Sequence, residues 1–313
     1  MLFTRPVTDV IRQRFSCRSY LETAIEEKKR AVLAGFLASN GAGPFGARTR
    51  FELVAATEHD RKALRGLGTY GFIKGATGFI IGAVGDGPQN LEDFGYLMER
   101  AVLLATDLGL GTCWLGGSFT KSSFARRISA RDSESVPAVC SIGYAADSPR
   151  NTTLRQRLGA TDRLAWEKMF FDRRFGAPLS PQAAGALAVP LEMVRRGPSA
   201  SNKQPWRIVK DGGAWHFYVQ RTPGYRDQWI ARLLNIADMQ RVDMGIAMSH
   251  FELTAHELGL KGAWAVRDPG IAAPDRLTEY TVTWTGDGCP PGGKGCEGVD
   301  GISYRAYPQM LIT

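Results

Sequence analysis

Two stretches of this sequence, 150 positions apart, are copies of each other: residues 93–114, DFGYLMERAVLLATDLGLGTCW, and residues 243–264, DMGIAMSHFELTAHELGLKGAW. Aligned without a gap, they share nine of 22 positions (Asp, Gly, Met, Leu, Ala, Leu, Gly, Leu and Trp). Unrelated segments would share about one or two. The 313 residues therefore indicate two copies of one unit, each close to the usual domain length of roughly 150 residues.

Each copy has the apolar pattern of a helix, with apolar residues three and four positions apart. The first copy carries Phe94, Leu97, Met98, Ala101, Leu104, Ala105 and Leu108, and the second carries Met244, Ala247, Met248, Phe251, Ala255 and Leu258. Gly109 and Gly259 are expected to close these helices in the left-handed conformation, before a short strand that bears an aromatic residue. Because apolar residues cover most of each circumference, we expect central helices that pack on one another. Two separately buried helices are the alternative.

The rest of each half repeats a helix, a glycine-bearing loop and a strand. These are expected at 23–38, 41–49 and 51–55, and again at 182–195, 197–204 and 206–209. Thr23 and Glu26 have the spacing of a capping box. A short helix is expected at 8–13, and further strands at 78–84, 138–144, 215–219 and 280–284. The pattern predicts an α+β fold with halves 1–160 and 161–285, a polar surface connector at 146–162, and a Gly/Pro-rich tail at 286–313.

Composition narrows the class of protein. With 44% hydrophobic and 22% charged residues, and no apolar run of the roughly 18 residues that span a bilayer, the chain reads as cytoplasmic with no membrane partner. The net charge is +8, and basic residues gather at 121–131 and 150–174. No nucleic-acid-binding motif accompanies these clusters, so we expect no nucleic-acid partner. The cysteines (Cys17, Cys113, Cys140, Cys289 and Cys296) have no metal-ligand spacing and suit reduced thiols. Pairing of Cys289 with Cys296 stays open.

Two polar motifs are candidates for ligand recognition. Residues 197–206, GPSASNKQPW, crowd hydroxyls and amides that could bind a heterocycle, although Pro, Ser and Asn also build ordinary turns. Arg14, Ser16 and Arg18 place two guanidiniums around a hydroxyl, which suits a phosphate. The alternative is that these arginines end a short helix and are solvated.

Both motifs resemble the FMN-dependent nitroreductase family, in its single-chain tandem form. The loop looks like the family's Pro-Ser-x-x-Asn-x-Gln-Pro-Trp signature, and the Arg-Phe-Ser-Cys-Arg run at 14–18 looks like its N-terminal motif. Three more features match: the Leu-Gly-Leu-Gly-Thr-Cys-Trp run at 108–114, Gly116-Gly117, and Ile142-Gly143-Tyr144. The resemblance covers about residues 7–285 and implies a pseudo-dimer within one chain, with antiparallel-dominated sheets and central helices.

The resemblance also implies where FMN binds. Arg14, Ser16 and Arg18 would hold its phosphate and ribityl chain, with Gly116 and Gly117 from the same half. The other half would contribute residues that face the flavin ring: Pro198, Ser199, Ser201, Asn202 and Gln204. A further phosphate cation is expected from Arg163, ahead of Arg150. The reverse pairing has only the loop at 40–47 and no second Arg-x-Ser-x-Arg, so we expect one FMN per chain.

These features predict an FMN-dependent NAD(P)H oxidoreductase that acts as a monomer. Hydride would pass from the nicotinamide to the flavin and on to a small electron acceptor, such as a quinone, nitroaromatic or enone, in a ping-pong scheme. No catalytic side chain is needed: His59, His216, His250 and His256 fit no triad, and no Gly-x-Gly-x-x-Gly motif follows a strand. The alternatives are a flavin-sequestering protein, with residues 225–234 or the tail as a lid, and a non-catalytic interaction module.

Overall fold

The computed structural model describes residues 2–39, 42–58, 60, 62–157, 159–224 and 237–286. Several sequence-based predictions lie outside these residues: His59, the possible pair of Cys289 and Cys296, the segment 225–234, and the tail beyond Gly286. Within the described ranges, no helix combines the length and apolar character needed to cross a membrane.

Two sheets of the same strand order form the body of the molecule. The first runs β1 (Thr49–Ala55), β2 (Gly78–Gly85), β5 (Val139–Gly143), β3 (Gly111–Leu115), with β4 (Glu134–Ser135) beside β2. The second runs β6 (Phe170–Asp172), β7 (Trp206–Asp211), β8 (Ala214–Gln220), β10 (Thr278–Gly286), β9 (Gly262–Ala265). The path β1-β2-β5-β3 matches β7-β8-β10-β9, and every pairing except β6 with β7 is antiparallel. The duplicated α+β fold is confirmed.

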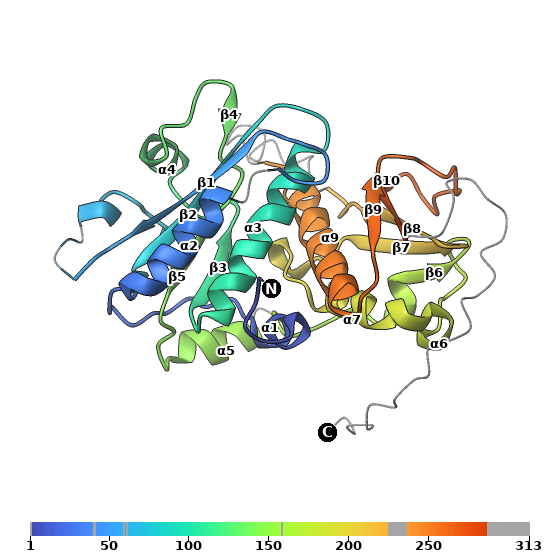
Figure 1. Cartoon of the computed structure of the whole chain (residues 1–313), viewed down its shortest axis with the longest axis horizontal. Helices are drawn as coiled ribbons and strands as arrows, with labels where there is room; N and C mark the ends of the chain where they lie inside the picture. Colours follow the sequence, from blue (N-terminus) through green and yellow to red (C-terminus); the bar gives the residue numbers. More distant parts are fainter. Residues whose placement is uncertain are drawn as a thin grey trace.

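The two repeated segments form long helices that lie side by side between the sheets, α3 (Asn90–Asp107) and α9 (Met239–Glu257) (Figure 1). They cross in backbone contact at Gly95 and Gly245, which occupy the same position in the repeat. A Cβ on Gly95 would lie 2.1 Å from the carbonyl oxygen of Val242, and one on Gly245 would lie 2.0 Å from that of Glu92. Only glycine permits this approach, so the prediction that the repeated helices pack on one another is confirmed.

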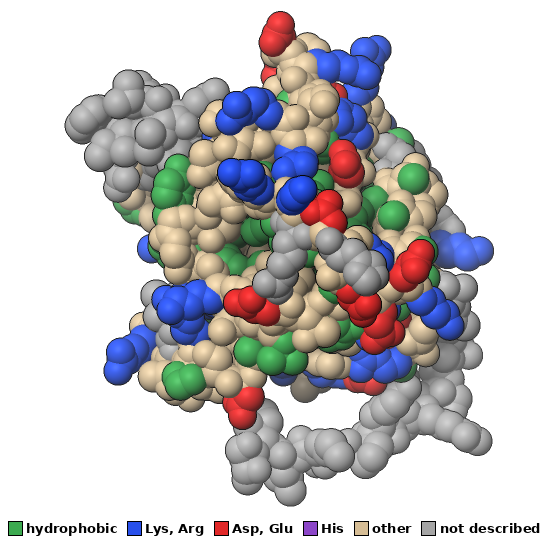
Figure 2. Space-filling model, turned by 90° about the vertical axis from the view of Figure 1, so that its left-hand side faces the viewer, with side chains coloured by type: hydrophobic (Ala, Val, Ile, Leu, Met, Phe, Trp, Pro, Cys, Tyr) green, Lys and Arg blue, Asp and Glu red, His purple; other side chains and the backbone are tan. Residues whose placement is uncertain are grey.

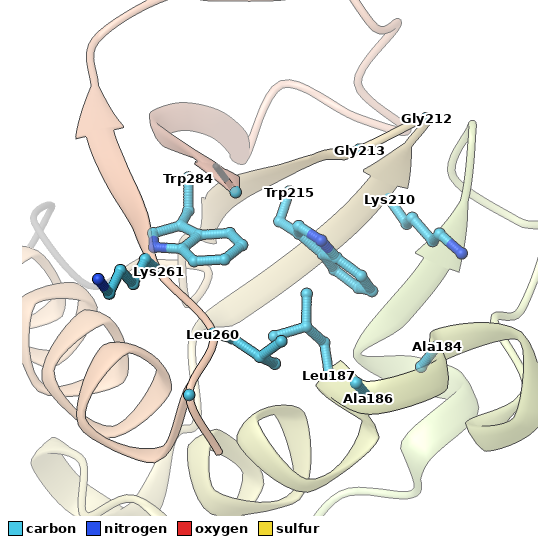
Figure 3. A pocket seen from close by; sticks show the side chains of 12 residues that line it. Ala184, Ala186, Leu187, Lys210, Gly212, Gly213, Trp215, Leu260, Lys261 and Trp284 are labelled. Atoms are coloured by element: carbon cyan, nitrogen blue, oxygen red, sulfur yellow. The ribbon is translucent and has the colours of Figure 1, made fainter. Parts of the chain in front are cut away.

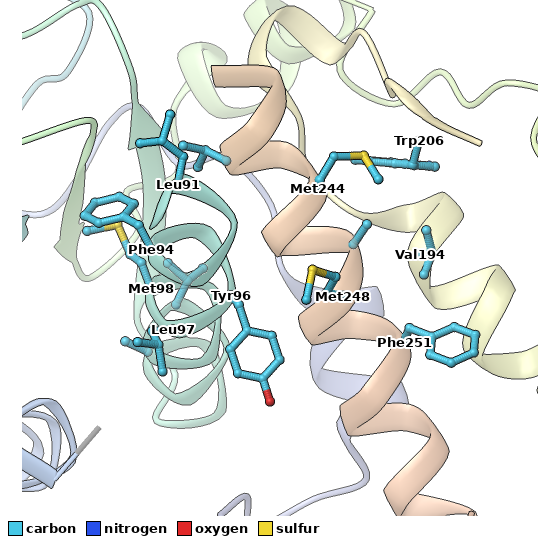
Figure 4. Packing of buried hydrophobic residues seen from close by; sticks show 14 of the residues in the cluster. Leu91, Phe94, Tyr96, Leu97, Met98, Val194, Trp206, Met244, Met248 and Phe251 are labelled. Atoms are coloured by element: carbon cyan, nitrogen blue, oxygen red, sulfur yellow. The ribbon is translucent and has the colours of Figure 1, made fainter. Parts of the chain in front are cut away.

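Apolar side chains on both helices bind them to their own sheets. Phe94, Leu97 and Met98 are buried on α3, while Met244, Met248 and Phe251 of α9 pack toward Trp206 of β7 and Val194 of α7 (Ala188–Arg196) (Figure 4). Gly109 and Gly259 have φ values of +78° and +75° at the helix ends. The predicted glycine closures are therefore confirmed, and one continuous core spans both halves.

The N-terminal segment ties the ends of the two central helices together. Thr4 N donates to Asp107 Oδ2 at 2.6 Å, and Arg5 Nε donates to Asp107 Oδ1 at 3.0 Å. Val7 N donates to a carboxylate oxygen of Glu257, the residue that corresponds to Asp107 in the repeat. Helix α1 (Val7–Gln13) then contacts α3, α7 and α9, and Arg14 directly follows its last residue.

Two predicted helices and the predicted connector differ from the structure. Helix α2 spans Glu27–Ser39, so the capping box of Thr23 and Glu26 is wrong, because the Glu26 carboxylate instead accepts from the Tyr144 hydroxyl at 2.9 Å. The helix expected at 182–195 is broken into α6 (Pro181–Ala184), a 3₁₀ turn (Gly185–Leu187) and α7, since Gly185 adopts a φ of +60°. The connector at 146–162 contains the helix α5 (Pro149–Arg157).

The remaining elements are short. Helix α4 spans Lys121–Arg127, and single 3₁₀ turns lie at Lys62–Leu64, Trp166–Lys168 and Ala200–Asn202. The last of these belongs to the polar loop that precedes β7.

We expect Glu134→Gln to flatten the acid dependence of stability. Arg50 donates to both carboxylate oxygens of Glu134, at 3.0 and 2.8 Å, and lowers the pKa of Glu134 from 4.5 to about 2. A folded-state pKa below the unfolded one stabilises the fold above pH 4.5 and loses that contribution as pH falls toward 2. Because Arg50 is partly exposed, the loss is about 1 kcal/mol. Thermal unfolding by circular dichroism across this window should show the gap between wild type and variant closing in acid; a constant gap would contradict the assignment.

Candidate functional site

A cleft of about 540 Å³ lies where the two halves meet. The first half contributes Arg14, Ser16, Arg18, Phe72, Ile73, Cys113, Trp114, Leu115, Gly116, Gly117 and Ser118, and the rest of the chain contributes Ala160, Arg163, Pro198, Ser199, Ala200, Ser201, Asn202, Met239, Asp243 and Ile246. All the predicted site residues except Gln204 are in this set. Two sequence-distant motifs therefore form opposite walls of one cleft.

The segment after α1 forms the cationic wall. Ser16 makes a parallel bridge with Thr112 of β3, and this extended backbone directs alternate residues to the same side. The Arg14 side chain is almost buried, with 8% of the residue's surface exposed. Its Nε and Nη1 atoms are buried and have no hydrogen-bond partner among the described residues. A nearly buried guanidinium that still lines a cleft indicates a site suited to an anion.

A helix in the connector fixes the position of Arg18. Asn151 of α5 accepts hydrogen bonds from the backbone nitrogens of Arg18 and Ser19 at 2.8 and 3.1 Å, and it donates to Ser19 O at 2.8 Å. Arg18 Nη1 also donates to Ser16 O at 3.3 Å. The connector thus supports the cationic wall from behind.

Glycine lets the two halves approach closely at the end of β3. A Cβ on Gly116 would lie 2.7 Å from the Cε atom of Met239, at the start of α9. Gly116 and Gly117 therefore expose backbone to the cleft where a larger residue would displace Met239.

The polar loop forms the opposite wall in a conformation that few residues adopt. Ser201, Asn202 and Gln204 have φ values of +51°, +53° and +49°. Each left-handed non-glycine residue costs on the order of 1 kcal/mol or more, so the surroundings must hold the loop. Ala200 N donates to Asp243 Oδ1 at 3.0 Å, and Gln204 N donates to Ser199 Oγ at 2.8 Å. Such constrained backbone is characteristic of functional sites.

Gln204 is the one predicted site residue that turns away from the cleft. Its Oε1 accepts from Leu164 N at 2.9 Å, and its Nε2 donates to Asn202 O at 3.1 Å. The Asn202 side chain lines the cleft but also donates to Gly159 O at 2.6 Å and accepts from Arg163 Nη1 at 3.3 Å. The loop and the segment that carries Arg163 are therefore linked.

The second candidate cation, Arg150, lies outside the cleft lining. Its Nη1 donates to Gly71 O and Phe72 O at 3.2 and 3.4 Å. Arg163 lines the cleft, which favours it over Arg150 as the additional cation.

Positive charge concentrates at one end of the cleft. Arg14, Arg18 and Arg163 face a single lining carboxylate, Asp243, and burial raises the pKa of that carboxyl well above its usual range. An adjoining hollow of about 370 Å³ shares Arg14 and Arg163 and adds Arg12, Arg195 and Arg196. This end of the cleft suits a small, multiply charged anion.

The corresponding loop in the first half keeps the scaffold without the polar side chains. Asp93, the repeat counterpart of Asp243, accepts from Phe45 N and Ala47 N at 3.1 and 2.8 Å. The loop itself reads Ala42-Gly-Pro-Phe-Gly-Ala47, and burial raises the pKa of Asp93. In the described part of the second half, no segment adds to β9 as Ser16 adds to β3. Both walls of a second site are therefore altered.

A separate hollow of about 450 Å³ lies at the far side of the second half (Figure 3). Trp215, Trp284, Leu187 and Leu260 supply apolar walls, with Lys210 and Lys261 at the sides. None of the predicted site residues lines it.

Reactive side chains for nucleophilic or metal chemistry are not assembled in the described part of the chain. Cys17 is buried beside the cationic wall, and burial raises the pKa of its thiol to about 11. Cys113 and Cys140 are also free and buried. No cluster of His, Cys, Asp and Glu suited to a metal ion occurs among the described residues. The structural role predicted for Cys17 is consistent with this burial.

The face shown in Figure 2 carries Lys and Arg side chains interspersed with Asp and Glu. The cleft and its adjoining hollow together gather six arginines: Arg12, Arg14, Arg18, Arg163, Arg195 and Arg196.

Two residues that the structure brings together received no functional role from the sequence: Glu99 was not singled out, and His250 was named only as fitting no triad. Glu99 and His250 are fully buried and 2.9 Å apart, behind the cationic wall. The sequence does mark both residues, because each is a titratable side chain within the otherwise apolar face of a repeated helix.

Taken together, the duplicated α+β halves, the central helix pair and the single cationic cleft define a class of protein in which one chain builds both walls of its site. The chain belongs to the family described as "Putative TM nitroreductase", whose model matches residues 6–255. None of the curated proteins matches it.

One solved structure supports the fold over most of the chain. A "putative nitroreductase" from Thermotoga maritima has a TM-score of 0.58 and 20% identity, covering 90% of this chain and 94% of that one. Two others match less than half of this chain. An FMN-dependent nitroreductase from Clostridium difficile has a TM-score of 0.37 and 22% identity, covering 44% of this chain and 87% of its own. A nitroreductase with bound FMN from Bacteroides fragilis has a TM-score of 0.35 and 19% identity, covering 46% and 91%.

Proposed function

We propose that this protein is an FMN-dependent NAD(P)H oxidoreductase that holds one flavin per chain in the cleft between its halves. The observation that carries the proposal is the convergence of Arg14, Ser16 and Arg18 with Ser199, Ser201 and Asn202 on one cleft, although the motifs are far apart in sequence. Membership of a nitroreductase family supports the same reaction class.

The residues present fit FMN. Arg14, Ser16, Arg18 and Arg163 all line the basic end of the cleft and would provide a phosphate site there. The polar loop of the second half and the exposed backbone at Gly116 and Gly117 would hold the ring, since neutral donors and acceptors suit its carbonyls and nitrogens. A volume of about 540 Å³ lies within the usual range of cofactor sites.

When bound, FMN would supply the electron chemistry, accepting hydride from NAD(P)H and passing it to a small acceptor such as a quinone, nitroaromatic or enone in a ping-pong cycle. The protein would orient the flavin and the substrate and enclose them in the cleft. Phe72, Ile73, Met239 and Ile246 form apolar parts of the lining, which exclude water from the reacting face. Phe72 is 54% exposed and offers an aromatic surface at the cleft to an incoming planar substrate.

The flavin-sequestering alternative differs in turnover, not in binding. It is favoured by the first half's loop, which keeps the backbone contact to Asp93 but carries none of the polar side chains of residues 199–204. Steady-state oxidation of NADH and NADPH with menadione or a nitroaromatic separates the two functions. The oxidoreductase should turn over many times per flavin, whereas a sequestering protein should retain FMN with negligible turnover.

The stoichiometry of flavin tests the site itself. We expect the purified monomer to bind one FMN per chain, measured by the flavin absorption spectrum against protein concentration, with light scattering for the oligomeric state. Two flavins per chain would contradict the single-site proposal. A colourless protein that does not bind added FMN would contradict the function and favour a non-catalytic interaction module.

A further inference from the structure

A buried polar cluster lies behind the cationic wall, across the contact between the two central helices. Glu99 of α3 and His250 of α9 are both 0% exposed, and Glu99 Oε1 lies 2.9 Å from His250 Nε2. The other carboxylate oxygen, Oε2, accepts from Trp114 Nε1 at 2.7 Å. Arg14 Nε lies 4.0 Å from Oε1. One carboxylate therefore connects α3, α9, β3 and the end of α1.

The histidine fixes this carboxylate from the second half. His250 Nδ1 lies 2.8 Å from the carbonyl oxygen of Met193 in α7. A carbonyl only accepts, so Nδ1 is the donor in that contact. A carboxylate oxygen also only accepts, so the contact between Nε2 and Glu99 Oε1 is a hydrogen bond when a proton lies between those two atoms. Both ring nitrogens are thus engaged, and the imidazole cannot rotate without breaking a buried hydrogen bond.

Two neighbours of Glu99, Arg14 and Trp114, line the cleft. Arg14 is charged and almost entirely buried, yet its Nε and Nη1 atoms form no hydrogen bond with the described residues. An uncompensated buried charge is unfavourable, so the nearby carboxylate is what retains the guanidinium at this position. At 4.0 Å the carboxylate offsets the charge of Arg14 without forming a hydrogen bond to its Nε, and the Arg14 side chain still lines the cleft.

We infer that Glu99 is a positioning residue, locked by His250, that holds Arg14 ready for the phosphate of the flavin. The inference rests on the proposed function and adds a specific dependence: the second half controls the phosphate site of the first through the chain His250, Glu99 and Arg14. Glu99 touches neither flavin nor substrate, because it is absent from the cleft lining.

Comparing FMN with riboflavin tests this inference, since riboflavin has the same ring but no phosphate. In Glu99→Gln, the dissociation constant for FMN, measured by fluorescence titration, should rise about tenfold or more. The constant for riboflavin should change less than about twofold. His250→Gln should act in the same direction although His250 does not contact Arg14. That variant carries the test if Glu99→Gln does not fold.

Glu252→Gln is the matched control. Glu252 lies on α9 and accepts a hydrogen bond from Tyr96 of α3, so it joins the same helix pair, but neither residue lines the cleft. Both flavins should bind this variant as they bind the wild type. In an Arg14→Gln background, Glu99→Gln should have no further effect on FMN, because the two residues act through one contact.

The outcomes separate three explanations. Equal weakening of FMN and riboflavin would overturn the inference and make Glu99 a general structural residue. Tighter FMN binding in Glu99→Gln would also overturn it, because repulsion between carboxylate and phosphate would then outweigh positioning. If neither flavin bound the wild-type protein, the proposed function would fail before this inference was reached.

Discussion

Gly245→Val is expected to lower the free energy of unfolding by roughly 4 kcal/mol or more, the largest effect of any single substitution considered for this chain. The added Cβ would lie 2.0 Å from Glu92 O and 2.6 Å from Tyr96 N, and both are backbone atoms of α3. Backbone cannot rotate aside as a side chain can, so α3 and α9 would have to separate. Separation would open the core that joins the two halves.

Thermal unfolding by circular dichroism should show a midpoint lower by about 10 °C or more. Gly35→Ala provides the control, because Gly35 lies within α2 and has no atom within 4 Å of the added Cβ. That substitution should stabilise the protein by about 0.5–1 kcal/mol by restricting the unfolded chain. An unchanged midpoint in Gly245→Val would mean that the central helices are not held in backbone contact.

Arg14→Met is expected to weaken FMN binding at least about a hundredfold while leaving riboflavin nearly unaffected. The Arg14 side chain lines the cleft beside Ser16 and Arg18, so its guanidinium would bind the phosphate directly. Hydrogen bonds to charged groups contribute about 1.5–3 kcal/mol each, and every 1.4 kcal/mol corresponds to about a tenfold change in affinity. Isothermal titration with each flavin measures the difference directly.

Arg12→Met is the matched control for this prediction. Arg12 lies in α1, two residues before Arg14, and lines only the adjoining hollow and not the cleft; its side chain is 48% exposed and pairs with Asp9 at 3.1 Å. Its loss should change FMN affinity by less than about threefold, through screened long-range charge alone. If both arginine variants weakened FMN equally, the phosphate site would be a diffuse basic surface and not a contact with Arg14.

The sequence predicted the architecture well because the repeat carries its own evidence. Apolar spacing located the central helices, and Leu-Gly-Leu located their ends, since only glycine readily takes the left-handed turn found at Gly109 and Gly259. Helix starts were less accurate. Thr23 and Glu26 satisfy a local capping pattern, but the tertiary contact of Glu26 with Tyr144 overrides it.

The sequence predicted the motifs that line the candidate site, but it did not predict the contacts that hold those motifs in place. Ser199 and Asn202 were identified from the loop pattern, whereas Gln204 uses both ends of its amide within the protein, which no local pattern reveals. Asn151 lies in a polar helix that reads as solvent-exposed, yet it organises the backbone of Arg18 and Ser19. Such roles depend on contacts made by the folded chain: Asn151 lies 133 positions from Arg18, and Leu164 lies 40 positions from Gln204.

The N-terminal segment that binds Asp107 and Glu257 has a consequence for how the protein responds to dilution. This segment and the two helices that it joins belong to one chain. The two halves therefore meet in an intramolecular step, and their effective concentration relative to each other does not change with protein concentration. Affinity for a ligand held between the halves should therefore be the same at nanomolar and micromolar protein. An assembly of separate subunits would instead lose its site as its partners dissociate.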